Sequence, residues 1–155
     1  KTIVKAEAMG KNPSGLLLGG GRVDAQALKT AYETGEAGPA PQAVLDIPKF
    51  GAINMHGSIL PQLRGSAPVQ RSILNHCDEA GVTAMYLSAG MDEGDIIEIR
   101  KTVIQPLETS EELMARLAQL AAPLCADTVR AIEAGTAPRI PQDNSSATYA
   151  PMLSK

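Results

Sequence analysis

The sequence predicts a single α/β domain, for three reasons. With 155 residues, the chain has the length of one ordinary domain built around one core. With 44% hydrophobic and 20% charged residues, it has the composition of a soluble globular protein. From residue 41 onward, segments with the pattern of strands alternate with segments with the pattern of helices. This alternation is typical of the α/β class.

The first forty residues are rich in glycine and lack a sustained apolar period. Short strands at 2–4 and 16–18 and a short helix at 24–34 are the elements predicted there. The run of three glycines at 19–21 fits neither a P-loop nor a dinucleotide-binding fingerprint. It predicts a turn or a flexible loop.

The pattern becomes regular with a short helix predicted at 42–47. Residues 51–56 then predict an apolar strand that turns polar at its end, where open α/β sheets usually place their ligands. A loop follows, and Ser66 is expected to cap a helix that runs through Ile73 with Pro68 in its first turn.

Two further strands are predicted at 81–89 and 95–104. The turn between them, at 90–94, contains two glycines. This arrangement predicts a hairpin or a tight corner.

A long helix is predicted after Thr109, which forms a capping box with Glu112. Apolar residues recur at helical spacing until Gly135 ends the run. Pro123 is expected to kink or split this helix. The remainder, 136–155, is rich in Pro, Ser, Asn and Thr and predicts a surface segment or linker leading out of the domain.

Three polar residues in these segments are candidates for chemistry. In an extended segment, Asn54 and His56 point to the same side of the chain and can converge on one ligand atom. The alternative is a histidine that only hydrogen-bonds the loop after the strand. If the strands are neighbours, the Asp92 carboxylate lies beside the imidazole and favours its protonated, hydrogen-bond-donating form. The alternative is an aspartate that only binds backbone amides of its own turn.

Charge and composition exclude several classes of function. With 14 basic and 17 acidic side chains, the net charge of −3 provides no global field for nucleic acid, so any RNA contact must be local. At 3%, aromatic residues are too few for a base-stacking platform. Neither an apolar run of the roughly 18 residues that span a membrane nor a secretory signal is found, so we expect a cytoplasmic protein without a membrane partner.

Other chemistries have little support in the sequence. Cys77 and Cys125 are expected to be ordinary reduced thiols. The two histidines and two cysteines show none of the spacings that zinc sites use, so no metal site is expected. Ser58 lies two residues from His56, but no G-x-S-x-G elbow surrounds it, which argues against a serine hydrolase.

Several motifs together resemble the folate-dependent formyltransferase family. Residues 53–61 read INMHGSILP, residues 64–70 read RGSAPVQ, and residues 91–95 read MDEGD. The stretch after the histidine resembles the H-x-S-L-L-P-x-x-R-G-A-A-P-I-Q stretch of the branch that formylates methionyl-tRNA. The resemblance extends over residues 41–155.

The resemblance implies that Asn54, His56 and Asp92 are the catalytic set, on an open Rossmann-like sheet with flanking helices. It implies transfer of a formyl group from 10-formyltetrahydrofolate to the amino group of initiator methionyl-tRNA through a tetrahedral intermediate. Physically, the amide and a protonated imidazole can donate to the carbonyl oxygen as it gains negative charge. The carboxylate keeps the imidazole charged and helps to relay the proton that the amine loses.

The resemblance also implies residues that bind donor and substrate. These are Gly57, Ser58, Leu60, Pro61, Arg64, Gly65 and Gly94. Gly57 and Gly65 would let the backbone pass close to substrate. Arg64 would either meet a phosphate or carboxylate group or be a solvated loop arginine.

The resemblance divides the chain into three parts. Residues 1–40 match the family poorly, residues 41–141 correspond to the catalytic core, and residues 142–155 are expected to be a linker or C-terminal extension. Because the family's catalytic domain begins with elements that residues 1–40 do not match, we expect that domain to be incomplete at its N-terminal side.

Two alternatives remain open. One keeps the folate donor but uses a small amine, such as a purine precursor or an amino sugar, as acceptor. The other is a non-catalytic remnant or binding module of the same fold. Comparing the formylation of charged tRNA with that of small amines tests the first alternative. Binding of a folate analogue tests the second.

Overall fold

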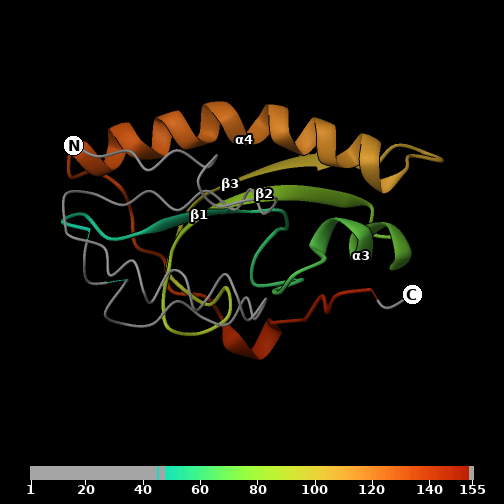
Figure 1. The fold of residues 1–155 in the computed structure, drawn as a ribbon, viewed down its shortest axis with the longest axis horizontal. Coiled ribbons are helices and arrows are strands. Elements are labelled where there is room, and N and C mark those ends of the chain that lie inside the picture. The colour runs from blue at the N-terminus through green and yellow to red at the C-terminus, as the bar shows by residue number, and fades with distance from the viewer. Residues whose placement is uncertain (1–44, 46–47, 154–155) are drawn as a thin grey trace, which may run out of the picture.

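A computed structural model describes Leu45 and residues 48–153, which form a three-stranded sheet with a long helix on one face (Figure 1). The strands are β1 (Ile53–His56), β2 (Glu79–Tyr86) and β3 (Ile96–Val103). They lie in the order β1-β2-β3, and each pair is antiparallel. The predicted α/β class and the predicted hairpin are confirmed.

The elements predicted for residues 1–40 lie outside the described residues. Of the helix predicted at 42–47, only Leu45 is described, and it is helical and buried.

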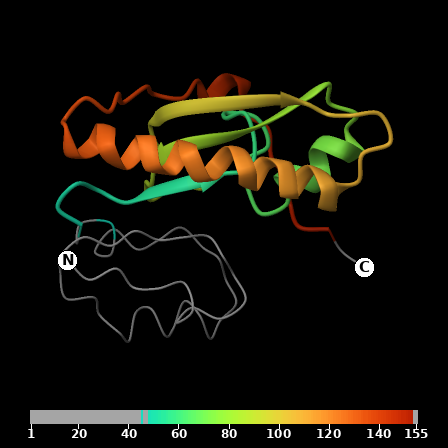
Figure 2. The same ribbon diagram turned by 90° about the horizontal axis from the view of Figure 1, so that it is seen from above.

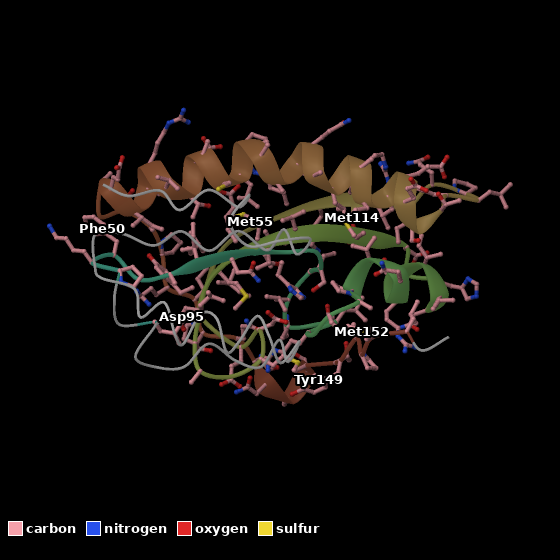
Figure 3. The ribbon with its side chains drawn as sticks, in the orientation of Figure 1. Phe50, Met55, Asp95, Met114, Tyr149 and Met152 are labelled. Atoms are coloured by element: carbon pink, nitrogen blue, oxygen red, sulfur yellow. The ribbon has the colours of Figure 1, made fainter. Side chains whose placement is uncertain are left out.

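Pairing between β1 and β2 decides which side chains share a face of the sheet. Asn54 lies opposite Met85, and His56 lies opposite Thr83. Because side chains alternate along a strand, these four residues share one face. Met55 points to the other face, where it packs against the apolar core (Figure 3).

The helix α4 (Ser110–Glu133) covers the Met55 face of the sheet. Its predicted capping box is confirmed, because the Thr109 hydroxyl accepts from the Glu112 amide and the Glu112 side chain accepts from the Thr109 amide. The buried residues recur with helical spacing toward the sheet. They are Leu113, Leu117, Leu124 and Thr128.

Pro123 does not split α4, contrary to one of the two expected outcomes. The helix runs without interruption for 24 residues, as Figure 1 shows. Proline removes the hydrogen bond to the carbonyl four residues earlier, here that of Gln119. Both residues are exposed, so that carbonyl can bind water instead.

No helix within the described ranges has both the length and the apolar character needed to cross a bilayer.

The helix α3 (Pro68–Leu74) follows the loop after β1, and its N-cap lies one residue later than expected. The predicted N-cap Ser66 is wrong, because Ala67 occupies that position and no side chain caps the helix. Pro68 is at the first helical position, where its fixed φ and missing N–H are tolerated. The Ala67 amide instead donates to the carbonyl of Ala150 at 3.0 Å.

Residues 140–151, here called the C-terminal strap, pack back onto the domain. After α4 the chain passes the start of β3, where Ile140 pairs with Ile96, and continues on the side of the sheet away from α4 (Figures 1 and 2). It includes a short 3-10 helix, η2 (Asn144–Ser146). Ala150 is fully buried. Most of the strap is exposed, as in the surface segment that was one of the expected alternatives, and its backbone bonds to the loop after β1.

Candidate active site

The end of β1 places the His56 ring in a buried position beside Asp92. The ring atom Nε2 lies 2.9 Å from the Leu63 carbonyl oxygen. Because a carbonyl can only accept, Nε2 carries the hydrogen of that bond. The other ring atom, Nδ1, lies 3.6 Å from Asp92 Oδ2. Nδ1 is therefore the nitrogen that can gain or lose a proton, and it faces a carboxylate.

The His56 ring has two neighbours, one on the loop and one on the turn before β3. The histidine hydrogen-bonds the loop after its strand, through Leu63, and it also lies beside the Asp92 carboxylate. The predicted proximity of imidazole and carboxylate is confirmed. At 5% exposure, the histidine is shielded from bulk water, which strengthens its interaction with the carboxylate.

Asp92 reaches out of its turn to the loop after β1. Its Oδ2 accepts a hydrogen bond from the Gly65 amide at 2.8 Å. Its backbone has a φ of 50°, a left-handed conformation in which aspartate is among the favoured residue types. The carboxylate therefore does more than bind its own turn, because it joins two segments of the site.

Asn54 lies on the same strand face as His56 and is half-buried. Its side-chain amide has no hydrogen-bond partner within residues 48–153. The amide thus lies on the face of β1 that also carries His56. An amide, an imidazole and a carboxylate in this order can donate to an oxygen that gains negative charge and can move a proton.

Arg64 fits neither expectation from the sequence. It is 2% exposed, so it is not a solvated loop residue. Its Nε and Nη2 donate to Gln142 Oε1 at 3.1 and 2.7 Å, and Nη2 also donates to Asn144 Oδ1 at 2.8 Å. The strap folds over the loop and supplies these two acceptors, so the guanidinium binds side chains of the chain itself.

Two glycines of the predicted site are required by close backbone contacts. Gly65 has a φ of 108°, and a Cβ there would lie 3.0 Å from the Ala150 carbonyl oxygen. A Cβ on Gly94 would lie 1.8 Å from the Tyr86 carbonyl oxygen. Both glycines therefore allow the segments around Asp92 to approach each other.

The remaining predicted binding residues form the loop beneath the site. Ser58 Oγ donates to the Gln62 carbonyl at 2.6 Å, and among the described residues Ser58 makes no hydrogen bond to His56. Leu60 is buried against Met85 and Ile96. These contacts give the serine and the leucine structural roles and lend no support to a serine nucleophile.

A cavity of about 380 Å³ adjoins this loop. Gly57 and Ser58 line it, together with residues at the end of α3 and the start of β2. Neither Asn54 nor Asp92 lines it. This cavity therefore lies beside the loop after β1 and is not lined by the side chains of the candidate site.

Sequence reasoning missed Gln142 and Asn144. Both lie in a segment rich in Pro, Ser and Asn that has no helical or strand period. The only local sign is that apolar Ile140 and Ala150 enclose the polar stretch. In residues 48–153 no group of three or more His, Cys, Asp or Glu residues could hold a metal ion.

Comparison with known families gives a match over most of the core. A family model described as "Formyl transferase" matches residues 40–129. A methionyl-tRNA formyltransferase from Methylacidiphilum infernorum is 46% identical over 114 residues, which is 74% of this chain and 36% of the relative. One from a Synechococcus strain is 50% identical over 115 residues, again 74% of this chain and 36% of the relative. The chain thus spans about a third of the length of these relatives.

Solved structures show the same fold. A formyltransferase from Anoxybacillus kamchatkensis, solved with a nucleotide sugar and tetrahydrofolate, has a TM-score of 0.61 and 32% identity over 67% of this chain and 54% of its own. A methionyl-tRNA formyltransferase from Clostridium thermocellum has a TM-score of 0.56 and 19% identity over 74% of this chain and 47% of its own. These likenesses confirm the Rossmann-like fold of the formyltransferase type, of which the described strands are an antiparallel part.

Proposed function

The chain belongs to the formyl transferase family, and we propose that its site transfers a formyl group from 10-formyltetrahydrofolate to the amino group of initiator methionyl-tRNA. The observation that carries the proposal is the His56–Asp92 pair, 3.6 Å apart, with Asn54 on the same strand face. The identity to methionyl-tRNA formyltransferases, 46% and 50% in the two relatives, supports this acceptor.

In the proposed reaction, the amine nitrogen of the acceptor attacks the formyl carbon of the donor. The carbonyl oxygen gains negative charge, and the Asn54 amide and the protonated His56 donate to it. His56 acts through Nδ1, because Nε2 donates to the Leu63 carbonyl. The bond from the formyl carbon to N10 then breaks, and the proton that leaves the amine is transferred to N10. Asp92, whose Oδ2 lies 3.6 Å from Nδ1, takes part in this proton transfer.

We assign the walls of the site to the loop after β1 and to the turn before β3. Gly57, Pro61, Gly65 and Gly94 keep the backbone of these segments close to the reacting groups, and Leu60 supports the loop from the core side. Contact with tRNA is local, because the net charge is −3. With charged tRNA as the acceptor, we propose that the reaction takes place in the cytoplasm.

A small amine is the second candidate acceptor. The Anoxybacillus kamchatkensis formyltransferase was solved with a nucleotide sugar, and its fold and 32% identity favour an amino sugar as the alternative. Formylation of methionyl-tRNA and of amino-sugar nucleotides by the same preparation separates the two. A higher kcat/KM for the sugar would overturn the tRNA assignment and keep the formyl transfer.

The proposed chemistry is tested by comparing the two histidines of the chain. His56→Asn should lower kcat by roughly a hundredfold or more, because it removes the protonated donor. The matched control is His76→Asn, since His76 is exposed and asparagine tolerates its φ of 51°. Wild-type turnover by His56→Asn would contradict the mechanism. A chain that binds no folate analogue in calorimetry would instead be a non-catalytic remnant.

A further inference from the structure

Gln142 connects the two sides of the candidate site through a single side-chain amide. Its Nε2 donates to the carbonyls of Asp92 at 2.9 Å and Gly94 at 2.8 Å. Its Oε1 accepts from Nε and Nη2 of Arg64 at 3.1 and 2.7 Å. A glutamine amide has two donor hydrogens and two acceptor lone pairs, so all four are used. Turning the amide over would place donors against Arg64 and the oxygen against two carbonyls, so its orientation is fixed.

Asp92 is thereby held through both its side chain and its backbone. Its carboxylate accepts from the Gly65 amide, and its carbonyl accepts from Gln142. Gly65 follows Arg64 in the chain, and the Arg64 side chain binds the same glutamine. These contacts form a closed ring. It runs from the Asp92 carboxylate to the Gly65 amide, through the Arg64 side chain to Gln142, and back to the Asp92 carbonyl.

The backbone of the same loop holds the histidine. Leu63, on the other side of Arg64, accepts from His56 Nε2. The Arg64 amide donates to the Thr148 carbonyl at 2.9 Å, and the Ala150 amide donates to the Arg64 carbonyl at 2.6 Å. The strap therefore fixes the residue that lies between the partner of His56 and the partner of Asp92.

From these contacts we infer that Gln142 is a positioning residue, which sets the Asp92 carboxylate against Nδ1 of His56. The inference rests on the proposed function only where it predicts a change in the rate of formyl transfer. Gln142 acts through the backbone of the Asp92 turn, because its recorded bonds go to the carbonyls there and to Arg64. Without its two donors, the carbonyls of Asp92 and Gly94 lose their partner, and the turn is free to move the carboxylate.

Two substitutions separate the donor half of the amide from its acceptor half. Gln142→Glu keeps the size of the side chain and an oxygen acceptor for Arg64, but it loses both N–H donors. Gln142→Met keeps the length and removes donors and acceptors together. The control is Asn144→Ala, which removes the other oxygen bound to Arg64 Nη2 and makes no recorded bond to the Asp92 turn.

The experiment measures kcat, both KM values and the nitrogen NMR shift of His56 Nδ1 in the 155-residue chain. Both Gln142 variants should move the Nδ1 signal and lower kcat by about tenfold to a hundredfold, since small displacements of catalytic groups have effects of that order. Both KM values should stay within about twofold, because uniform binding is not altered. Asn144→Ala should leave the Nδ1 signal unchanged.

Two results would overturn the inference. One is a wild-type Nδ1 signal in a folded Gln142→Glu chain, and the other is a wild-type kcat in that variant. If Gln142→Met does not fold, Gln142→Glu decides, because it retains the bond to Arg64. If the wild-type chain transfers no formyl group, the proposed function fails, while the Nδ1 signal still tests the positioning by itself.

Discussion

The two faces of the sheet are stabilised in different ways. The face under α4 is packed with apolar side chains, among them Leu113, Leu117 and Leu124, which meet several neighbours at once. The opposite face holds His56 and Asp92 through one or two directed hydrogen bonds each. Apolar packing is non-directional and shared among many residues, whereas each polar bond depends on one partner. The larger apolar cluster therefore lies under α4, whereas the groups of the proposed chemistry lie on the opposite face, beside the smaller cluster of Leu60, Met85 and Ile96.

The largest effect on stability is expected under α4. Leu124→Ala should lower the free energy of unfolding by roughly 2 to 5 kcal/mol, because the leucine is fully buried and leaves a cavity. Urea unfolding followed by circular dichroism measures this loss. The specific activity of the folded fraction should not change. A loss of activity without a loss of stability would contradict the separation of the two faces.

Adjacent residues of β1 test the separation within one strand. Asn54→Ala should lower kcat by about a hundredfold to a thousandfold, the effect of losing one donor to an oxyanion. Its stability should stay within about 0.5 kcal/mol of the wild type, as for other substitutions outside the core.

Met55→Ala is the matched comparison for Asn54→Ala, because Met55 packs against the core on the other face. It should lower stability by less than the roughly 2 to 5 kcal/mol of a fully buried methionine. Steady-state kinetics and urea unfolding on both variants give the comparison. Equal losses of rate in the two would show that β1 does not divide the functions in this way.

A smaller effect on stability is expected at the start of α4. Thr109→Ala removes the hydroxyl that accepts from the Glu112 amide and should lower the free energy of unfolding by about 1 kcal/mol. Thr109→Ser keeps this hydroxyl and serves as the control. Thermal unfolding of both variants measures the difference. Equal melting temperatures would mean that packing alone determines where the helix begins.

The smallest effect is expected from the ion pair between β3 and α4. A side-chain hydrogen bond from Arg100 lowers the pKa of Asp127 from its ordinary value of 3.8. A carboxyl whose pKa is lowered by folding stabilises the fold above its unfolded pKa, and this contribution is lost as the pH falls through the folded pKa.

Asp127→Asn should therefore lower the urea midpoint slightly at pH 7, and the difference from the wild type should shrink as the pH falls below about 4. Exposure and salt screening keep the effect small. Unfolding in urea at several pH values measures it. A difference that grows on acidification would contradict the assigned sign.

Local patterns predicted most of the apolar face. The capping box at Thr109 and the leucines after it predicted α4, and alternation within β1 placed Asn54 and His56 on one side. The proximity of Asp92 also required the hairpin pairing of the strands. Predictions that rest on spacing along the chain were therefore the successful ones.

The polar face was less predictable, for a physical reason. Arg64 binds Gln142 and Asn144, which lie 78 and 80 residues further along the chain. A single polar contact between residues so far apart in the chain produces no repeating pattern of residue types from which it could be predicted. The cap at Ser66 was misplaced because Pro68 and the Ala67–Ala150 bond determine where α3 begins. Pro123 does not split α4, since Pro123 and Gln119, whose carbonyl loses its partner, are both exposed residues and the carbonyl can bind water.

The position of the strap after α4 has a consequence for biosynthesis. A growing polypeptide has already emerged with Arg64 and the hairpin before residues 142–150 are translated. Until then, the guanidinium lacks the two oxygens that later surround it. A nascent chain can thus bury the leucines of α4 while its reactive groups are still unaligned. Translation of residues 142–150 is therefore the step that supplies the side-chain partners of Arg64.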